Sequence, residues 1–150
     1  MKIILSSIRE GSAAKHREMN ALVDLYLTRA TKYSAADSHI AASESDFWAM
    51  LDRQSARTQP VTILLDPRGQ QLSSEQLAAR FGQLQRDSAQ MVVLAIGPAD
   101  GWSDASRGRA TQLLSLGPMT LPHELARVVL AEQLYRACTI LAGHPYHSGH

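Results

Sequence analysis

Three side chains near the end of the chain, His144, Tyr146 and His147, are of the types that move protons. They form the segment HPYH at 144–147, which follows a turn-rich apolar loop and a long amphipathic stretch, GPMTLPHELARVVLAEQLYRA at 117–137. Imidazole and phenol groups act as general acids or bases, and a tyrosine ring can also stack on a nucleobase. A loop, a helix and this cluster in succession predict a functional site, although any one histidine could equally be a solvated or capping side chain.

Two loops containing glycine and proline could hold a ligand through their backbone. The first, IGPADGWSD at 96–104, follows an apolar run, and the missing side chain of Gly97 lets a ligand approach closely. The second loop is uncharged and comprises Gly117, Pro118, Met119, Thr120, Leu121 and Pro122. With Leu65 at the end of VTILLD, these loops could cradle an adenosine-type ligand. The alternative for the first loop is a plain tight turn, and no P-loop or dinucleotide fingerprint is present.

Hydrophobic periodicity predicts alternating strands and helices. The apolar runs at 61–66 and 91–96 are typical of strands buried on both faces, and further strands are expected at 2–8, 38–42 and 113–116. Helices are expected at 15–33, 46–57, 73–87, 103–112 and 123–142, with Ser73 and Gln76 at capping-box spacing. This order predicts an α/β fold, a mostly parallel sheet with helices on both faces. Ligands of such sheets bind beyond the carboxyl ends of the strands, here at 66–72, 97–103 and 117–123.

The spacing of apolar residues also predicts which helix faces are buried. In the helix at 15–33 the buried face comprises Met19, Leu22, Val23, Tyr26 and Ala30. In the helix at 123–142 it comprises Leu125, Val128, Val129, Ala131, Leu134, Tyr135, Cys138 and Leu141. Glu132 lies four residues before Arg136, which predicts an ion pair on that helix.

Length and composition fit one compact domain covering residues 1–150. The chain has 150 residues, 45% hydrophobic and 19% charged, which excludes a disordered chain. No apolar run is long enough for a membrane span or a secretion signal, so we expect a soluble cytoplasmic protein without a membrane partner. The single cysteine, Cys138, is expected to be a small buried hydrophobe in a reducing compartment. A net charge of +1 gives no support of its own to nucleic-acid binding.

The segments at 117–137 and 144–147 resemble the C-terminal signature of the RlmH family, SPOUT-class methyltransferases that act on N3 of a pseudouridine in large-subunit ribosomal RNA. The resemblance covers most of the chain after about residue 60 and, more loosely, the N-terminal part. It implies S-adenosyl-L-methionine as the cofactor, bound at Leu65, at Gly97 and at the loop from Gly117 to Pro122. It also implies a C-terminal segment threaded as a trefoil knot, and a homodimer in which the tail of one subunit completes the cofactor pocket of the other.

The same resemblance implies roles for the polar residues of the C-terminal part. His144, Tyr146 and His147 are the candidates for accepting the imide proton of the target base or stabilising its deprotonated form. Tyr146 and His147 are candidates for contact with RNA. Arg127 and Arg136 flank the inner face of the last helix, where they could contact RNA phosphates or a partner subunit, or form ion pairs within the chain. His123, next to the cofactor loop, could order the pocket.

Two departures from the family pattern leave an alternative open. Ile96 stands where the family has the first glycine of its middle loop, with Ala99 and Asp100 in place of one glutamate, and Ser148 replaces a basic residue after HPYH. A non-catalytic or diverged relative that binds RNA or cofactor would fit these changes. A metal site at His144, His147 and His150 is a further alternative, but Pro145 opposes the helical turn that would gather them.

Overall fold

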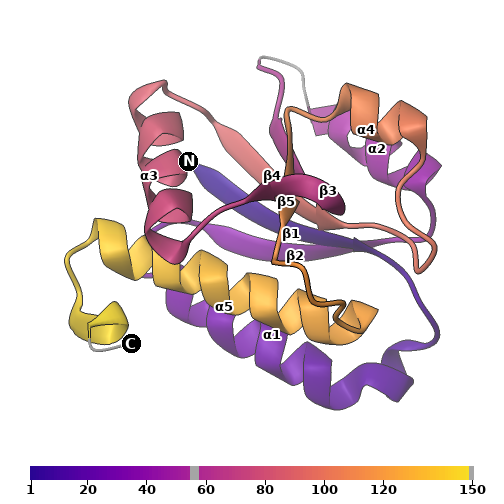
Figure 1. Cartoon of the computed structure of the whole chain (residues 1–150), viewed down its shortest axis with the longest axis horizontal. Coiled ribbons are helices and arrows are strands. Elements are labelled where there is room, and N and C mark those ends of the chain that lie inside the picture. The colour runs from indigo at the N-terminus through magenta and orange to yellow at the C-terminus, as the bar shows by residue number, and fades with distance from the viewer. Residues whose placement is uncertain (55–57, 149–150) are drawn as a thin grey trace.

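The protein is built on a five-stranded parallel sheet, seen here in a computed structural model that describes residues 1–54 and 58–148 (Figure 1). Its strands are β1 (Lys2–Ile8), β2 (Ala36–Ala41), β3 (Val61–Gln71), β4 (Met91–Ile96) and β5 (Gln112–Ser115). They are arranged in the order β2-β1-β4-β3-β5, and every pairing is parallel. The central strand β4 is a run of Val, Leu and Ile buried on both faces, which is the pattern that predicts a parallel sheet. The predicted sheet is therefore confirmed.

Helices cover both faces of this sheet, as the sequence predicts. They are η1 (Ala13–His16), α1 (Arg17–Ala30), α2 (Glu44–Gln54), α3 (Ser74–Arg86), α4 (Asp104–Arg109), α5 (His123–Leu141) and η2 (Pro145–His147). On one face α1, α3 and α5 pack against Ile3, Leu5 and Leu94. On the other, Phe47 and Trp102 belong to a second cluster that includes Ile4 and Leu64. Figure 1 shows α1 and α5 side by side on the first face and α2 and α4 together on the second.

A local sequence signal fixes the start of α3, and a tertiary contact limits the length of α4. The side chain of Ser73 accepts from Gln76 N and the side chain of Gln76 accepts from Ser73 N, so the predicted capping box of α3 is confirmed. The predicted helix at 103–112 is too long: α4 ends at Arg109, because Thr111 leaves the helix to bond with Thr62 on β3. The predicted end of α2, at Arg57, lies outside the described residues.

The carboxyl end of β3 differs from the prediction, because the strand does not stop at Asp66. After an irregularity at 66–69 it pairs again with β5, at Gln70 with Leu114 and at Gln71 with Ser115. Gly69 permits this return: a Cβ there would lie 2.5 Å from the backbone nitrogen of Leu114. Most of the expected ligand loop at 66–72 is therefore strand, and only its first residues belong to the edge where ligands would bind.

The buried faces of α1 and α5 were only partly predictable. In α1 the buried residues are Val23, Leu27 and Ala30, whereas Leu22 is 41% exposed. In α5, Leu125 and Leu141 are exposed, and small residues such as Ala126 and Ala137 are buried in their place. Small side chains let α5 lie close to α1 and to the sheet, and the spacing of apolar residues predicts only some of them. Within the described part of the chain, no helix has the length and hydropathy needed to cross a bilayer.

Gly69→Ala should lower the free energy of unfolding by roughly 1–3 kcal/mol, because the added methyl group meets the backbone of β5 and forces the two strands apart. Urea unfolding followed by circular dichroism measures this change. Gly108→Ala in α4 is the matched control, since a Cβ there meets nothing within 4 Å, and it should leave stability unchanged or raise it by about 0.4–1 kcal/mol. Equal stability of the two variants would contradict the close approach at Gly69.

Candidate functional site

The three segments predicted to hold a cofactor meet at one edge of the sheet. Leu65 of β3 lies in register between Ile96 of β4 and Leu114 of β5. Gly97 follows β4 directly, and the loop 116–122 follows β5 directly. Because the strands are parallel, their carboxyl ends reach the same edge. The structure therefore brings together Leu65, Gly97 and the loop that contains Gly117–Pro122.

Gly97 is buried against the indole of Trp102. A Cβ at residue 97 would lie 2.8 Å from the Trp102 ring, so only glycine fits. The carbonyl of Trp102 and the carboxylate of Asp66 both accept from Arg107 of α4, which holds the loop in place. Among the described residues, the Trp102 indole Nε1 is buried without a hydrogen-bond partner. The loop thus offers a ligand mainly the backbone groups of residues next to Gly97.

The loop after β5 presents an uncharged surface. Ser115 Oγ lies 3.2 Å from both the nitrogen and the oxygen of Gly117, and Gly117 has a φ of +130°, which favours glycine. Pro118 and Thr120 are exposed, and residue Met119 is 85% exposed. An apolar, backbone-rich loop of this kind fits the adenosine part of S-adenosyl-L-methionine, because such a group needs shape and a few hydrogen bonds rather than a charged partner.

His123, at the start of α5, joins the two loops. Its Nε2 lies 2.9 Å from the carbonyl oxygen of Gly97. Its Nδ1 lies 2.9 Å from a carboxylate oxygen of Glu124 and 3.2 Å from one of Glu10, which follows β1. The ring therefore fixes the backbone after β4 to the first turn of α5 and to the segment after β1, in agreement with an ordering role.

Two of the three predicted catalytic residues, Tyr146 and His147, belong to a separate cluster with Glu75, Glu132 and Arg136, which we name the tail cluster. Arg136 lies 2.7 Å from Glu132, which confirms the predicted ion pair. Tyr146 donates from its hydroxyl to Glu132 at 3.2 Å, and its ring packs edge-on against Tyr135 with centroids 4.7 Å apart. His147 bridges Arg136 at 2.9 Å and Glu75 at 2.7 Å. The tail is therefore folded back onto α5 and α3.

This environment sets the protonation of the tail cluster. Burial, and next the carboxylate of Glu132, raise the pKa of Tyr146, so its phenol stays protonated at neutral pH and can donate a hydrogen bond. The hydrogen bond from His147 lowers the pKa of Glu75. Elsewhere on α5, burial raises the pKa of Cys138 to about 11, and its unpaired thiol is buried as expected.

The structure does not bring the tail cluster to the cofactor loops within one chain. Glu132 lies nine residues after His123 on α5, which at 1.5 Å per residue is a separation of about 13 Å. His144 is exposed, and its Nδ1 accepts from the backbone of Tyr146, so in this arrangement it caps the turn η2. The predicted site residues thus lie in two separate groups within one chain.

Arg127 and Arg136, the arginines predicted to contact RNA, are both engaged inside the protein. Arg127 is only 5% exposed and donates to Glu124 at 2.6 Å and to Asn20 at 2.8 Å. Arg136 belongs to the tail cluster. His150, one member of the alternative metal site, lies outside the described residues, and among the described ones no group of three or more His, Cys, Asp or Glu is placed to hold a metal ion.

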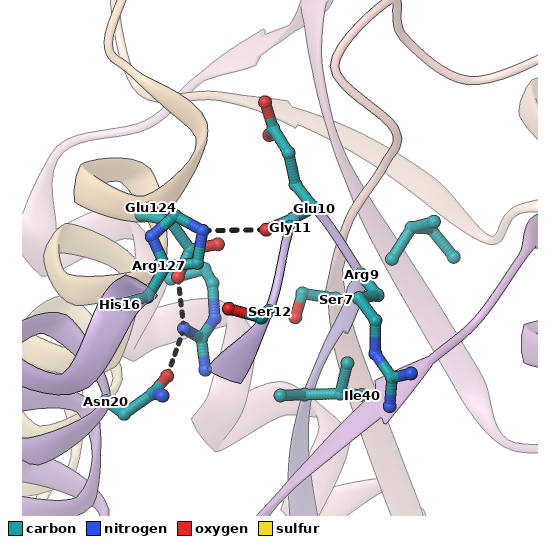
Figure 2. A pocket seen from close by; sticks show the side chains of 11 residues that line it. Ser7, Arg9, Glu10, Gly11, Ser12, His16, Asn20, Ile40, Glu124 and Arg127 are labelled. Carbon is teal, nitrogen blue, oxygen red and sulfur yellow. Dashed lines mark hydrogen bonds and ion pairs between the residues drawn. The ribbon is translucent and has the colours of Figure 1, made fainter. Parts of the chain in front are cut away.

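A cavity at the carboxyl end of β1 has no direct signal in the sequence. The cavity has a volume of about 340 Å³ and lies between the segment after β1, the start of α1 and the first turn of α5 (Figure 2). The sequence Arg-Glu-Gly-Ser at 9–12 directly follows the first predicted strand and is typical of a plain turn. The strand-end rule that predicts the other loops applies to β1 as well, and would have found it.

Comparison with known proteins agrees with this geometry. The family described as "Predicted SPOUT methyltransferase" matches residues 1–147. A protein from Koribacter versatilis named ribosomal RNA large subunit methyltransferase H is 48% identical over 91% of this chain and 92% of its own length. A relative of the same name from Mesorhizobium japonicum is 42% identical over 98% of this chain and 99% of its own length.

A solved structure has the same fold at much lower identity. A probable methylase family protein from Haemophilus influenzae superimposes with a TM-score of 0.56 and 8% identity, over 99% of this chain and 70% of that one. The matched family spans nearly the whole chain and includes the three loops at the sheet edge. This chain belongs to the SPOUT methyltransferase family.

Proposed function

We propose that the protein transfers a methyl group from S-adenosyl-L-methionine to large-subunit ribosomal RNA, at N3 of a pseudouridine. The observation that carries the proposal is the meeting of Leu65, Gly97 and the loop 116–122 at one sheet edge, joined by the bond from His123 to Gly97. Membership of the family and the name shared by relatives aligned over at least 92% of their length support the enzyme over a non-catalytic relative.

The residues of the edge fit the cofactor through their backbone. Leu65, Gly97 and the segment Gly117–Pro122 would hold it, with the uncharged loop against its adenosine part. When bound, the cofactor supplies a methyl group on a positively charged sulfur. The contribution of these residues is positioning, which accounts for a large share of the rate when two reactants must be aligned.

Tyr146 is suited to stabilise the target base. Methylation of an imide nitrogen requires the loss of its proton, and negative charge then develops on the neighbouring carbonyl oxygens. A phenol that stays protonated donates to such an oxygen. Arg136, whose guanidinium carbon lies 4.9 Å from the centre of the Tyr146 ring, adds positive charge nearby. His144 and His147 remain predicted catalytic residues.

A homodimer would unite the two halves of the site. The tail cluster is about 13 Å along α5 from the cofactor loops, so a tail acting on the substrate would come from a second copy of the chain. Leu22 and Leu25 of α1 and Leu125 of α5 are large apolar residues that are at least 37% exposed. A second copy packed on this surface would cover them.

The direct test uses ribosomes that lack the modification. Incubation of large subunits with the protein and S-adenosyl-L-methionine, followed by mass spectrometry of the nucleosides, should yield N3-methylpseudouridine. Calorimetry with the cofactor alone distinguishes the enzyme from a non-catalytic relative. Cofactor binding without methylation would favour the non-catalytic relative.

Gly97→Val should abolish cofactor binding, because a branched side chain would meet the indole of Trp102, 2.8 Å from the new Cβ. Calorimetric titration with S-adenosyl-L-methionine measures the loss, and circular dichroism verifies folding. Ala99→Val, at an exposed position of the same loop, should bind normally. If the clash is the cause, adding Trp102→Leu to Gly97→Ala should improve the affinity over that of Gly97→Ala alone. Unchanged affinity of Gly97→Val would contradict the assignment.

Tyr146→Ala should lower kcat roughly 100-fold while leaving the cofactor Kd unchanged, since the phenol acts on the base and not on the cofactor. Tyr146→Phe keeps the ring packing on Tyr135 and removes only the hydroxyl that bonds to Glu132. If kcat falls as far in Tyr146→Phe as in Tyr146→Ala, the effect belongs to the hydroxyl group. Parallel loss of cofactor affinity in the Ala variant would refute this division of roles.

Mixing inactive Gly97→Val and Tyr146→Ala subunits tests the shared site. If the tail of one subunit serves the loops of the other, about a quarter of wild-type activity should return. Half of the randomly mixed dimers are heterodimers, and each heterodimer has one intact site of its two. Activity after unfolding and refolding the mixture together is compared with that of each variant refolded alone. No recovery, with dimers demonstrated by light scattering, would place the tail and loops of each site in one chain.

A further inference from the structure

The cavity at the end of β1 is built from residues that the cofactor loops and the tail cluster do not use. Its floor and walls include Ser7, Ile8, Ser12, Asn20, Ile40 and Arg127. In Figure 2 the guanidinium of Arg127 lies between Glu124 and Asn20, and the ring of His16 bonds to the backbone at Glu10. Its volume of about 340 Å³ falls within the range of about 300–1,000 Å³ that is usual for small-ligand sites.

The charges around this cavity cancel. Two arginines, Arg9 and Arg127, line it together with two glutamates, Glu10 and Glu124. Arg127 is held by Glu124 at 2.6 Å and by Asn20 at 2.8 Å, so its charge is already compensated. An anion such as a phosphate would therefore gain little from Arg127.

The remaining lining suits a flat ring with polar edges. Ile8 and Ile40 give apolar surface, and Ser7 and Ser12 add hydroxyl groups that can donate or accept. The Ser12 side chain makes no hydrogen bond to cap the helix that follows it. A uracil-type ring has two carbonyl acceptors and N–H donors on its edge, which such hydroxyl groups can pair with.

The cavity also shares a wall with the cofactor site. Glu124 and Arg127 in the first turns of α5 line it, and His123 beside them bonds to the carbonyl of Gly97. Glu10 lies on its rim and reaches the same His123 ring at 3.2 Å. A group held in this cavity would therefore lie next to the loops that hold the methyl donor.

We propose that this cavity receives an extruded pyrimidine base of the RNA substrate. The inference rests on the proposed function and assigns its base-binding residues: the hydroxyls of Ser7 and Ser12 at the ring edge, the side chains of Ile8 and Ile40 at the ring face, and the paired Arg127 and Asn20 at the back. Enzymes that modify a base take it out of the stack into such a pocket, where its edge is recognised by hydrogen bonds. The role predicted for Arg127 thus becomes contact with a base and not with a phosphate.

Filling the cavity tests the proposal. Ile40, 41% exposed on β2, can be replaced by an aromatic residue that strands accommodate. Ile40→Trp and, independently, Ser12→Phe should lower kcat/KM for the RNA roughly tenfold or more and leave the cofactor Kd unchanged. Ser45→Trp adds the same bulk at an exposed position of α2 and should behave as wild type. Wild-type kinetics in both cavity variants would overturn the proposal, and so would a parallel loss of cofactor affinity, which would place part of the cofactor in the cavity.

A binding measurement that needs no activity separates this inference from the proposed function. Uridine titrated into labelled wild-type protein should shift the amide resonances of Gly11, Ser12 and Asn20, and the shifts should vanish in Ile40→Trp. Absent shifts in the wild type, or equal shifts with inorganic phosphate, would overturn the base pocket even if methylation is observed. Shifts in the wild type without any methylation of ribosomes would support the pocket and reject the methyltransferase assignment.

Discussion

The parallel register of the sheet is the constraint from which the rest of the structure follows. Leu65 is fixed between Ile96 and Leu114 by the ladders of β3, β4 and β5, and the loops after these strands must therefore lie side by side. No side chain has to be charged or reactive for this arrangement to work, because the backbone itself presents the donors and acceptors. The proposed cofactor site therefore depends on strand pairing far more than on individual side chains.

The start of α5 connects the loop after β4 to α1. His123 reaches the carbonyl after β4, Glu124 lies within reach of both His123 and Arg127, and Arg127 reaches Asn20 on α1. These contacts are mostly buried, where a hydrogen bond left without its partner costs about 1–3 kcal/mol. The cofactor loops and the cavity at β1 are thus parts of one hydrogen-bonded network, and a displacement of α5 would disturb both.

Much of the fold could be predicted from local patterns, whereas features that depend on close approach could not. The apolar run of β4 and the capping box of α3 are visible in the sequence because each is a short-range signal. The return of β3 to β5 depends on Gly69 meeting the backbone of Leu114, 45 residues away in sequence. For the site, the strand ends predict that the loops after β3, β4 and β5 meet at one edge of the sheet, whereas their role in cofactor binding rests on the family resemblance. The pairing of Arg127 and the folding of the tail onto α3 are tertiary, and the knotted threading stays a prediction from the family resemblance.

The arrangement of arginines bears on how such a protein could recognise RNA with a net charge of only +1. Arg107, Arg109, Arg127 and Arg136 all lie within ion-pair distance of carboxylates of the same chain. Each phosphate contact by these residues would require breaking an existing pair, so the electrostatic part of binding gains little from them. These four arginines therefore favour recognition of the substrate's shape and of the base over recognition of its phosphates. The proposed base pocket beside the loops at the sheet edge would provide one surface for that kind of recognition. In the proposed homodimer, the tail of the second subunit would provide another.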